Sequence, residues 1–188
     1  MKKHQDISDK ELIKGCIACK RTYQERLYAK YAPKMFSICL RYASDYHSAE
    51  DILQDAFIKT YRNIGKFRHE GSFEGWLRRI FVNTAIEHYR RKVIMYPILE
   101  VDNSEYDVLN ENVISDLAAD DLMKMVNDLS PGYRTVFNLY VIEGYPHKEI
   151  AKMLKISEGT SKSQLARARY LLQKKVRKLY KNQKEAYV

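Results

Sequence analysis

The chain has 188 residues, of which 45% are hydrophobic, enough to bury a core in one domain or in two small ones. Its 33 lysines and arginines exceed its 24 aspartates and glutamates, and the net charge of +9 favours a polyanion as partner without saying which. The longest uncharged apolar run, VIMYPIL, is too short to span a bilayer, and no apolar segment follows the basic N-terminus, so we expect a cytoplasmic protein without a signal peptide.

Helical periodicity dominates the chain, and glycine and proline are few (7 and 4), which predicts an all-α fold. Several helix boundaries carry recognisable signals: a hydroxyl with an acidic residue three positions later, or proline at a first helical position. The signals are Ser8 with Glu11, Ser48 with Asp51, Ser130 followed by Pro131, and Gly144 with Pro146 between two helices.

Three cysteines, Cys16, Cys19 and Cys39, make an odd count that does not suggest a disulfide framework. Cys16 and Cys19 form a CxxC, but no second Cys or His pair follows at the spacing of a zinc site. We therefore predict no metal site, and read the pair as small residues on the apolar face of a helix.

The segment 48–64, SAEDILQDAFIKTYRNI, has two distinct faces when projected as a helix. A predicted core face comprises Ile52, Leu53, Ala56, Phe57, Thr60 and Ile64. The opposite face comprises Asp51, Gln54, Asp55, Ile58 and Arg62. An apolar residue ringed by acidic groups resembles an interface for a basic partner, whereas a merely solvated face is the alternative.

The segment 71–92, GSFEGWLRRIFVNTAIEHYRRK, contains the chain's single tryptophan and shows no single apolar stripe. Leu77, Phe81 and Ala85 share one side of a helix and are predicted to be core. A narrow basic and polar line comprises Arg79, Asn83 and Arg90, with Trp76 at its border. Trp76 fits either the core or a nucleic-acid surface.

Composition changes from Pro97 to Asp121, where lysine and arginine are absent and acidic residues recur. We predict an acidic linker at 97–116 between two helical domains, 1–96 and 117–188, with a solvated acidic helix as the alternative.

The segment 145–178 shows two short apolar seams separated by a tight turn, the pattern of a helix-turn-helix. The second helix begins with Gly159, Thr160 and Ser161, whose backbone amides suit a phosphate. Its face away from the seam offers short residues with arginine and lysine, as a major-groove reader requires. That face comprises Lys162, Ser163, Ala166, Arg167, Arg169 and Tyr170.

Taken together, these segments resemble the extracytoplasmic-function (ECF) sigma factors of bacterial RNA polymerase. AEDILQDAF and FEGWLRRIFVN resemble the family's region 2, and EIAKML followed by GTSKSQLARAR resembles its region 4. The resemblance implies a non-enzymatic subunit without a catalytic residue or cofactor, which binds core polymerase, recognises promoters and promotes their melting. It also implies docking on the coiled coil of the polymerase largest subunit and on the flap. An anti-sigma factor is typical of the family, although some members have none.

The resemblance assigns roles to the surfaces described above. The polymerase-binding set is Asp51, Gln54, Asp55, Ile58 and Arg62. The minus-10 set, which holds a base flipped from the non-template strand, is Phe67, Arg68, Gly71, Ser72, Phe73, Trp76, Arg79, Asn83 and Arg90. The minus-35 set is Gly159, Thr160, Lys162, Ser163, Ala166, Arg167 and Arg169. Tyr140, Ser161 and Ala166 depart from common family patterns, so the minus-35 sequence itself is not predicted.

Two other functions compete with this interpretation. A helix-turn-helix regulator with a ligand-binding or dimerising N-terminal domain explains 145–178 equally well, but leaves the acidic and tryptophan-containing helices unassigned. A metal-dependent nucleic-acid enzyme would use His47, Glu50, Asp51 and Asp55. This set converges poorly because neighbouring residues of a helix point about 100° apart.

Overall fold

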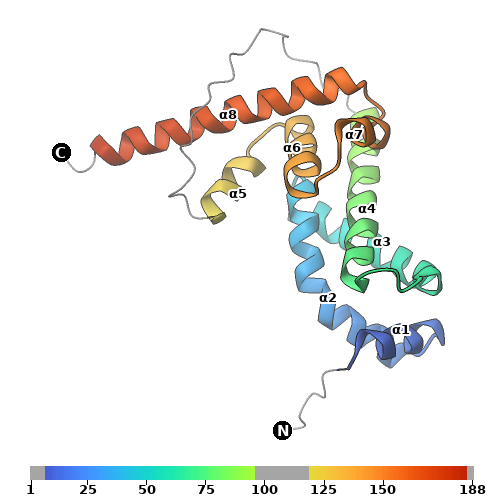
Figure 1. Ribbon diagram of the computed structural model, residues 1–188. Helices are drawn as coiled ribbons and strands as arrows, with labels where there is room; N and C mark the ends of the chain where they lie inside the picture. Colours follow the sequence, from blue (N-terminus) through green and yellow to red (C-terminus); the bar gives the residue numbers. More distant parts are fainter. Residues whose placement is uncertain (1–6, 96–118, 186–188) are drawn as a thin grey trace. The chain divides into compact units, whose positions relative to one another are not determined.

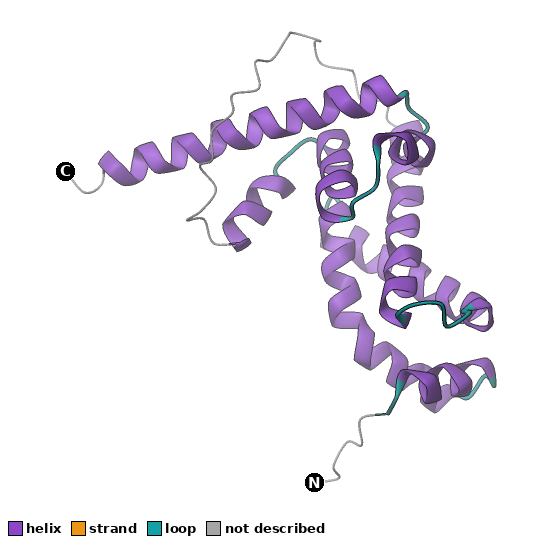
Figure 2. Ribbon diagram, in the orientation of Figure 1, coloured by secondary structure: helices purple, strands orange, loops and turns teal. Residues whose placement is uncertain are grey.

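The computed structural model describes residues 7–95 and 119–185, and within those ranges the regular elements are all helices (Figures 1 and 2). The chain divides into two compact units, Met1–Arg91 and Lys92–Val188. The prediction of an all-α protein with two helical domains is confirmed. The predicted linker, 97–116, lies outside the described residues.

The first unit is built around three longer helices and one short one. These are α1 (Asp9–Ile17), α2 (Arg21–Tyr42), α3 (Tyr46–Asn63) and α4 (Phe73–Met95), with a 3-10 turn at Ile64–Lys66. Helix α2 packs against both α1 and α3. Helices α3 and α4 meet through an edge-to-face contact of Phe57 with Phe81, whose ring centroids lie 5.1 Å apart. Leu27, Leu77 and Phe81 are fully buried, and each such side chain stabilises the fold by roughly 1.5–3 kcal/mol.

The predicted core residues of the first unit are confirmed. All six residues of the α3 core face are at most 7% exposed. Leu77, Phe81 and Ala85 of α4 are also buried, and so are Val82 and Ile86, which lie on other sides of the same helix. Helix α4 therefore packs on more than one side, which explains its lack of a single apolar stripe.

Two predicted helix starts have different outcomes. Ser8 caps α1 as expected, because its hydroxyl accepts from the amide of Glu11 at 3.3 Å. The predicted cap at Ser48 is wrong. Helix α3 begins one turn earlier, and the Asp45 carboxylate accepts from the Ser48 amide at 2.7 Å. A charged carboxylate at the N-cap also interacts favourably with the positive end of the helix, so Asp45 takes the place assigned to Ser48.

Gly15 lies at a close approach between α1 and α2. A Cβ atom added at this position would overlap the aromatic ring of Tyr23. Glycine is required here by space, because the ring lies directly against the backbone of α1.

The second unit contains α5 (Ala119–Asn127), α6 (Pro131–Phe137), α7 (His147–Leu154) and α8 (Glu158–Glu185). Its core joins Met125, Val126 and Leu129 to Ala168, Leu172 and Val176 of α8. Helix α6 begins at Pro131 as predicted, and continues as a π-helical segment at Asn138–Ile142 that sequence periodicity did not predict.

The helix-turn-helix is confirmed as α7 followed by α8. Lys155 ends α7 in the left-handed conformation, with φ +57°, and α8 starts three residues later. The seam predicted from the sequence packs here, since Ile150, Leu154 and Leu165 are at most 7% exposed.

Candidate nucleic-acid interface

The acidic face of α3, defined as Asp51, Gln54, Asp55, Ile58 and Arg62, lies opposite the core face and opens to solvent. Ile58 is 46% exposed and lies among the polar side chains of this face. Asp55 is half-buried because its carboxylate is bonded to His88 of α4, at 2.7 Å. Within the described part of the chain, the acidic face consists of five residues of α3, and the bond from Asp55 to His88 connects it to α4.

The loop that joins the 3-10 turn to α4 is shaped by two residues with positive φ. His69 has a φ of +58°. Gly71 has a φ of +121°, and a residue with a Cβ atom would be strained at that position. The ring of Phe67 packs against His69 with centroids 4.7 Å apart. Ser72 then caps α4, because its hydroxyl accepts from the Gly75 amide at 3.0 Å.

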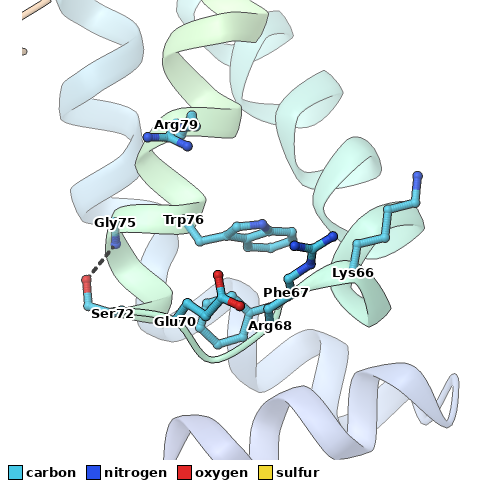
Figure 3. Close-up of a pocket in the computed structure, with 9 residues that line it drawn as sticks. Lys66, Phe67, Arg68, Glu70, Ser72, Gly75, Trp76 and Arg79 are labelled. Atoms are coloured by element: carbon cyan, nitrogen blue, oxygen red, sulfur yellow. Dashed lines mark hydrogen bonds between the residues drawn. The ribbon is translucent and has the colours of Figure 1, made fainter.

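This loop and the first two turns of α4 enclose an open pocket of about 460 Å³ (Figure 3). Figure 3 shows the side chains of Arg68 and Glu70 reaching from the loop toward the indole of Trp76. The complete lining is Lys66, Phe67, Arg68, Glu70, Gly71, Ser72, Gly75, Trp76 and Arg79. Six of these were predicted from the sequence, whereas Lys66, Glu70 and Gly75 were not.

Trp76, which the sequence left undecided, belongs to both the core and the pocket. Its indole stacks on Phe73 at 5.6 Å with an interplanar angle of 22°, and lies 5.6 Å from Phe67. Yet it is half-buried and lines the pocket. An aromatic ring fixed on one face and open on another can stack with a planar ligand at little conformational cost.

Phe73 does not lie where the sequence placed it. It was assigned to the minus-10 surface, but its side chain is only 4% exposed and contacts Tyr31 of α2 edge-on at 5.6 Å. Phe73 is the first residue of α4, and its side chain points into the domain. There its ring stacks against the indole of Trp76.

The polar line on α4 extends beyond the pocket. Arg79 lines the pocket, and Asn83 lies one turn further along the same side and is exposed. Arg90 is half-buried, nearly two turns beyond Asn83. The line therefore leads away from the pocket along the helix rather than into it.

On α8, the polar face is partly exposed and carries charge. Lys162 forms an ion pair with Glu158 at 2.9 Å, and Arg169 lies over the ring of Tyr140 at 5.8 Å. Arg167 lies over Tyr170 at 5.4 Å. Aromatic faces thus hold both guanidinium groups near the helix, where cation–π contacts favour an ordered position.

The start of α8 differs from the phosphate site expected there. The Ser157 hydroxyl accepts from the Thr160 amide at 2.9 Å, and the Ser161 amide donates to the Ser157 carbonyl. Two of the amides are therefore satisfied within the protein, and Gly159 remains exposed at the helix end. Thr160 is half-buried, Ser163 bonds the Thr160 carbonyl at 3.1 Å, and Ala166 is half-buried.

Ser161, noted as a departure from the family pattern, is fully buried and bonds His147 Nδ1 at 2.9 Å. His147 in turn stacks on Tyr140, with centroids 4.4 Å apart. This polar link connects α7 to α8. Desolvation, with a smaller contribution from Lys162, lowers the pKa of His147 from its usual value.

The described residues, 7–95 and 119–185, contain no cluster of three or more His, Cys, Asp or Glu side chains arranged to hold a metal ion. His47 lies 3.4 Å from the Glu50 carboxylate, and its ring contacts that of Tyr46 edge-on. Cys16 is buried, which raises its pKa to about 11, whereas Cys19 is exposed. A raised pKa disfavours the thiolate, the reactive form of the CxxC pair.

Two family descriptions match the chain and cover both units. Sigma-70 region 2 matches residues 27–93, which include α3, the loop, the pocket and most of α4. Sigma-70, region 4 matches residues 119–172, which include the helix-turn-helix. The ECF RNA polymerase sigma factor SigW of Bacillus subtilis is 33% identical over 161 residues, 79% of this chain and 86% of that protein.

The chain belongs to the ECF sigma factors. It is an alternative sigma factor for RNA polymerase, and the interpretation as a helix-turn-helix regulator that does not act as a sigma subunit is set aside, because region 2 is present as well. The ECF RNA polymerase sigma-E factor of Haemophilus influenzae is 29% identical over 188 residues, 93% of this chain and 98% of that protein. Among solved structures, the sigma factor RpoE bound to the anti-sigma factor NepR from Bartonella quintana has a TM-score of 0.47 and 23% identity, covering 80% of this chain and 94% of that one.

Within the described ranges of this sigma factor, every helix is too short or too polar to cross a lipid bilayer.

Proposed function

We propose that this sigma factor docks on core RNA polymerase through the acidic face of α3 and captures an unpaired minus-10 base in the pocket beside Trp76. The docking element is the coiled coil of the largest subunit, and the second unit contacts the flap while α8 reads the minus-35 element. The observation that carries the proposal is the pocket itself: one indole, three cationic side chains and a glycine-shaped loop around about 460 Å³.

The pocket has the chemistry that an extruded base requires. The indole supplies a stacking surface, and Lys66, Arg68 and Arg79, set against the single carboxylate of Glu70, give the lining a net positive charge that attracts the phosphates on either side of the base. Disrupting a base step costs about 1.4 kcal/mol on average. Stacking one base on protein returns about 1–3 kcal/mol. Capture of a single base therefore offsets the first step of melting without ATP.

The acidic face of α3 suits a basic protein surface better than DNA. Its carboxylates would repel phosphates in a chain of net charge +9, whereas Ile58 offers an apolar anchor at their centre. An apolar centre with a charged rim is the usual organisation of a protein interface.

On α8, Lys162, Ser163, Arg167 and Arg169 are the groups proposed to contact the minus-35 element, with Gly159 at the exposed helix end. Arginine contacts both phosphates and guanine edges, and lysine supplies a mobile charge for phosphates. Thr160 and Ala166, both half-buried, contribute by allowing the backbone to approach the groove.

The proposal has three further parts. The protein works in the cytoplasm, and its two domains are 1–96 and 117–188, joined by the acidic linker. It contributes no catalytic residue, because polymerase performs nucleotidyl transfer. An anti-sigma factor would compete for the two DNA-binding units.

Transcription with purified components tests the proposal. The full chain mixed with core polymerase and a supercoiled template is expected to give promoter-dependent transcripts, and their absence would refute it. Mapping transcript starts after overexpression would supply the minus-10 and minus-35 sequences needed for the binding experiments.

A further inference from the structure

We infer that His88 of α4 is a positioning residue for core polymerase binding, because it holds the Asp55 carboxylate in the orientation in which the acidic face presents it. The inference rests on the proposed docking role of α3. His88 lies on a different helix from the acidic face and 33 positions away from Asp55 in the sequence.

The contact is short and directional. His88 Nε2 lies 2.7 Å from Asp55 Oδ2, and the imidazole must be the donor because an ionised carboxylate only accepts. The side chain of His88 is 25% exposed and that of Asp55 is 45% exposed. The histidine is thus mostly covered, while the carboxylate it holds still faces solvent.

Only one carboxylate oxygen is used. Within the described residues Asp55 makes its contacts through Oδ2, which leaves Oδ1 available to a donor outside the protein. A carboxylate with one oxygen fixed and the other open is suited to receive an arginine or lysine of a partner in a single orientation.

A neighbouring pair on the same two helices provides an internal comparison. Lys59, one turn beyond Asp55, pairs with Glu87, next to His88, at 2.6 Å. Both pairs connect α3 to α4, but Lys59 is not part of the acidic face. If the role of His88 were only to fasten the helices together, loss of the Lys59–Glu87 pair would have the same consequence.

Loss of the His88 side chain should therefore weaken docking, because the Asp55 side chain is then no longer held in one orientation. A freed aspartate samples several rotamers, and fixing it again upon binding costs a factor of roughly two to ten in affinity. The effect should vanish when Asp55 itself is absent, since there is then nothing to position.

The test measures the affinity of the full chain for core polymerase in competition with labelled wild-type protein, with helicity and melting temperature recorded for each variant. His88→Ala should weaken binding two- to tenfold, His88→Gln should restore it by supplying an amide donor, and Glu87→Gln should leave it near wild type. In an Asp55→Ala background, His88→Ala should have no further effect.

The outcomes separate this inference from the proposed function. If Asp55→Ala binds core polymerase as tightly as wild type, the assigned docking face is wrong. If Asp55→Ala weakens binding but His88→Ala does not, or if Glu87→Gln weakens it equally, the docking face stands and the positioning role of His88 is refuted.

Discussion

Replacing Trp76 with alanine should weaken capture of the unpaired minus-10 base by about 5- to 150-fold, the equivalent of one stacking interaction of 1–3 kcal/mol. The substitution removes the indole that lines the pocket, while the cationic residues around it remain. Trp76→Phe should retain part of the affinity, since a smaller ring keeps some stacking.

The same substitution has a structural cost that must be separated from binding. Trp76 makes aromatic contacts with Phe73 and Phe67. Each such pair contributes about 0.5–1.5 kcal/mol beyond its buried area. Helicity and thermal melting should therefore show a destabilised but folded first unit.

Because Trp76 is the only tryptophan, its fluorescence reports the pocket directly. Titration with the non-template strand of a mapped promoter should change the emission of wild-type protein. Affinity for a minus-35 duplex, which the second unit is proposed to bind, serves as the control and should be unaffected by Trp76→Ala. Unchanged emission during the titration, together with wild-type affinity of a folded Trp76→Ala variant for the single strand, would refute the stacking role.

Four further predictions concern other parts of the chain. Asp55→Arg combined with Ile58→Glu should abolish core polymerase binding while helicity is retained, and recovery of polymerase in a pull-down would count against the acidic face. Asn83→Ala should reduce promoter opening, measured by permanganate footprinting, more than duplex binding in a gel shift; equal losses would contradict a role in melting. Gly15→Ala should destabilise the first unit by about 1–3 kcal/mol in denaturant unfolding, since the added methyl overlaps a packed ring, and an unchanged midpoint would exclude that overlap. The lowered pKa of His147 means that the unfolded chain binds more protons, so the second unit should lose stability as pH falls below about 6.5, with His147→Gln insensitive; matching melting profiles of the two proteins would rule this out.

Prediction of the fold from the sequence was most accurate where local periodicity determines the structure. The two faces of α3 follow from a 3.6-residue repeat, and each residue of its core face is buried. The helix-turn-helix was predicted for the same reason, together with its turn.

Contacts between distant residues were not predictable in this way. The bond of His88 to Asp55 and that of His147 to Ser161 depend on the packing of two helices, which no local pattern encodes. The burial of Phe73 depends on the path of the preceding loop, and that path is set by the positive φ of His69 and Gly71. Asp45 shows a different limit, because α3 begins three residues earlier than the Ser48 signal predicts and the Asp45 carboxylate provides the cap there.

The three roles of α4 have a consequence for how promoter preference can diverge. The helix supplies core residues, carries Arg79 and Asn83 on its polar line, and pairs with α3 through Glu87 and His88. Substitutions there disturb several functions at once. In the loop at 67–72 the structural roles described are those of Phe67, of the turn at His69 and Gly71, and of the Ser72 cap, so exchanging Arg68 or Glu70 should change what the pocket accepts at little cost in stability. New promoter specificities should therefore arise first in the loop, while the helix behind it remains constant.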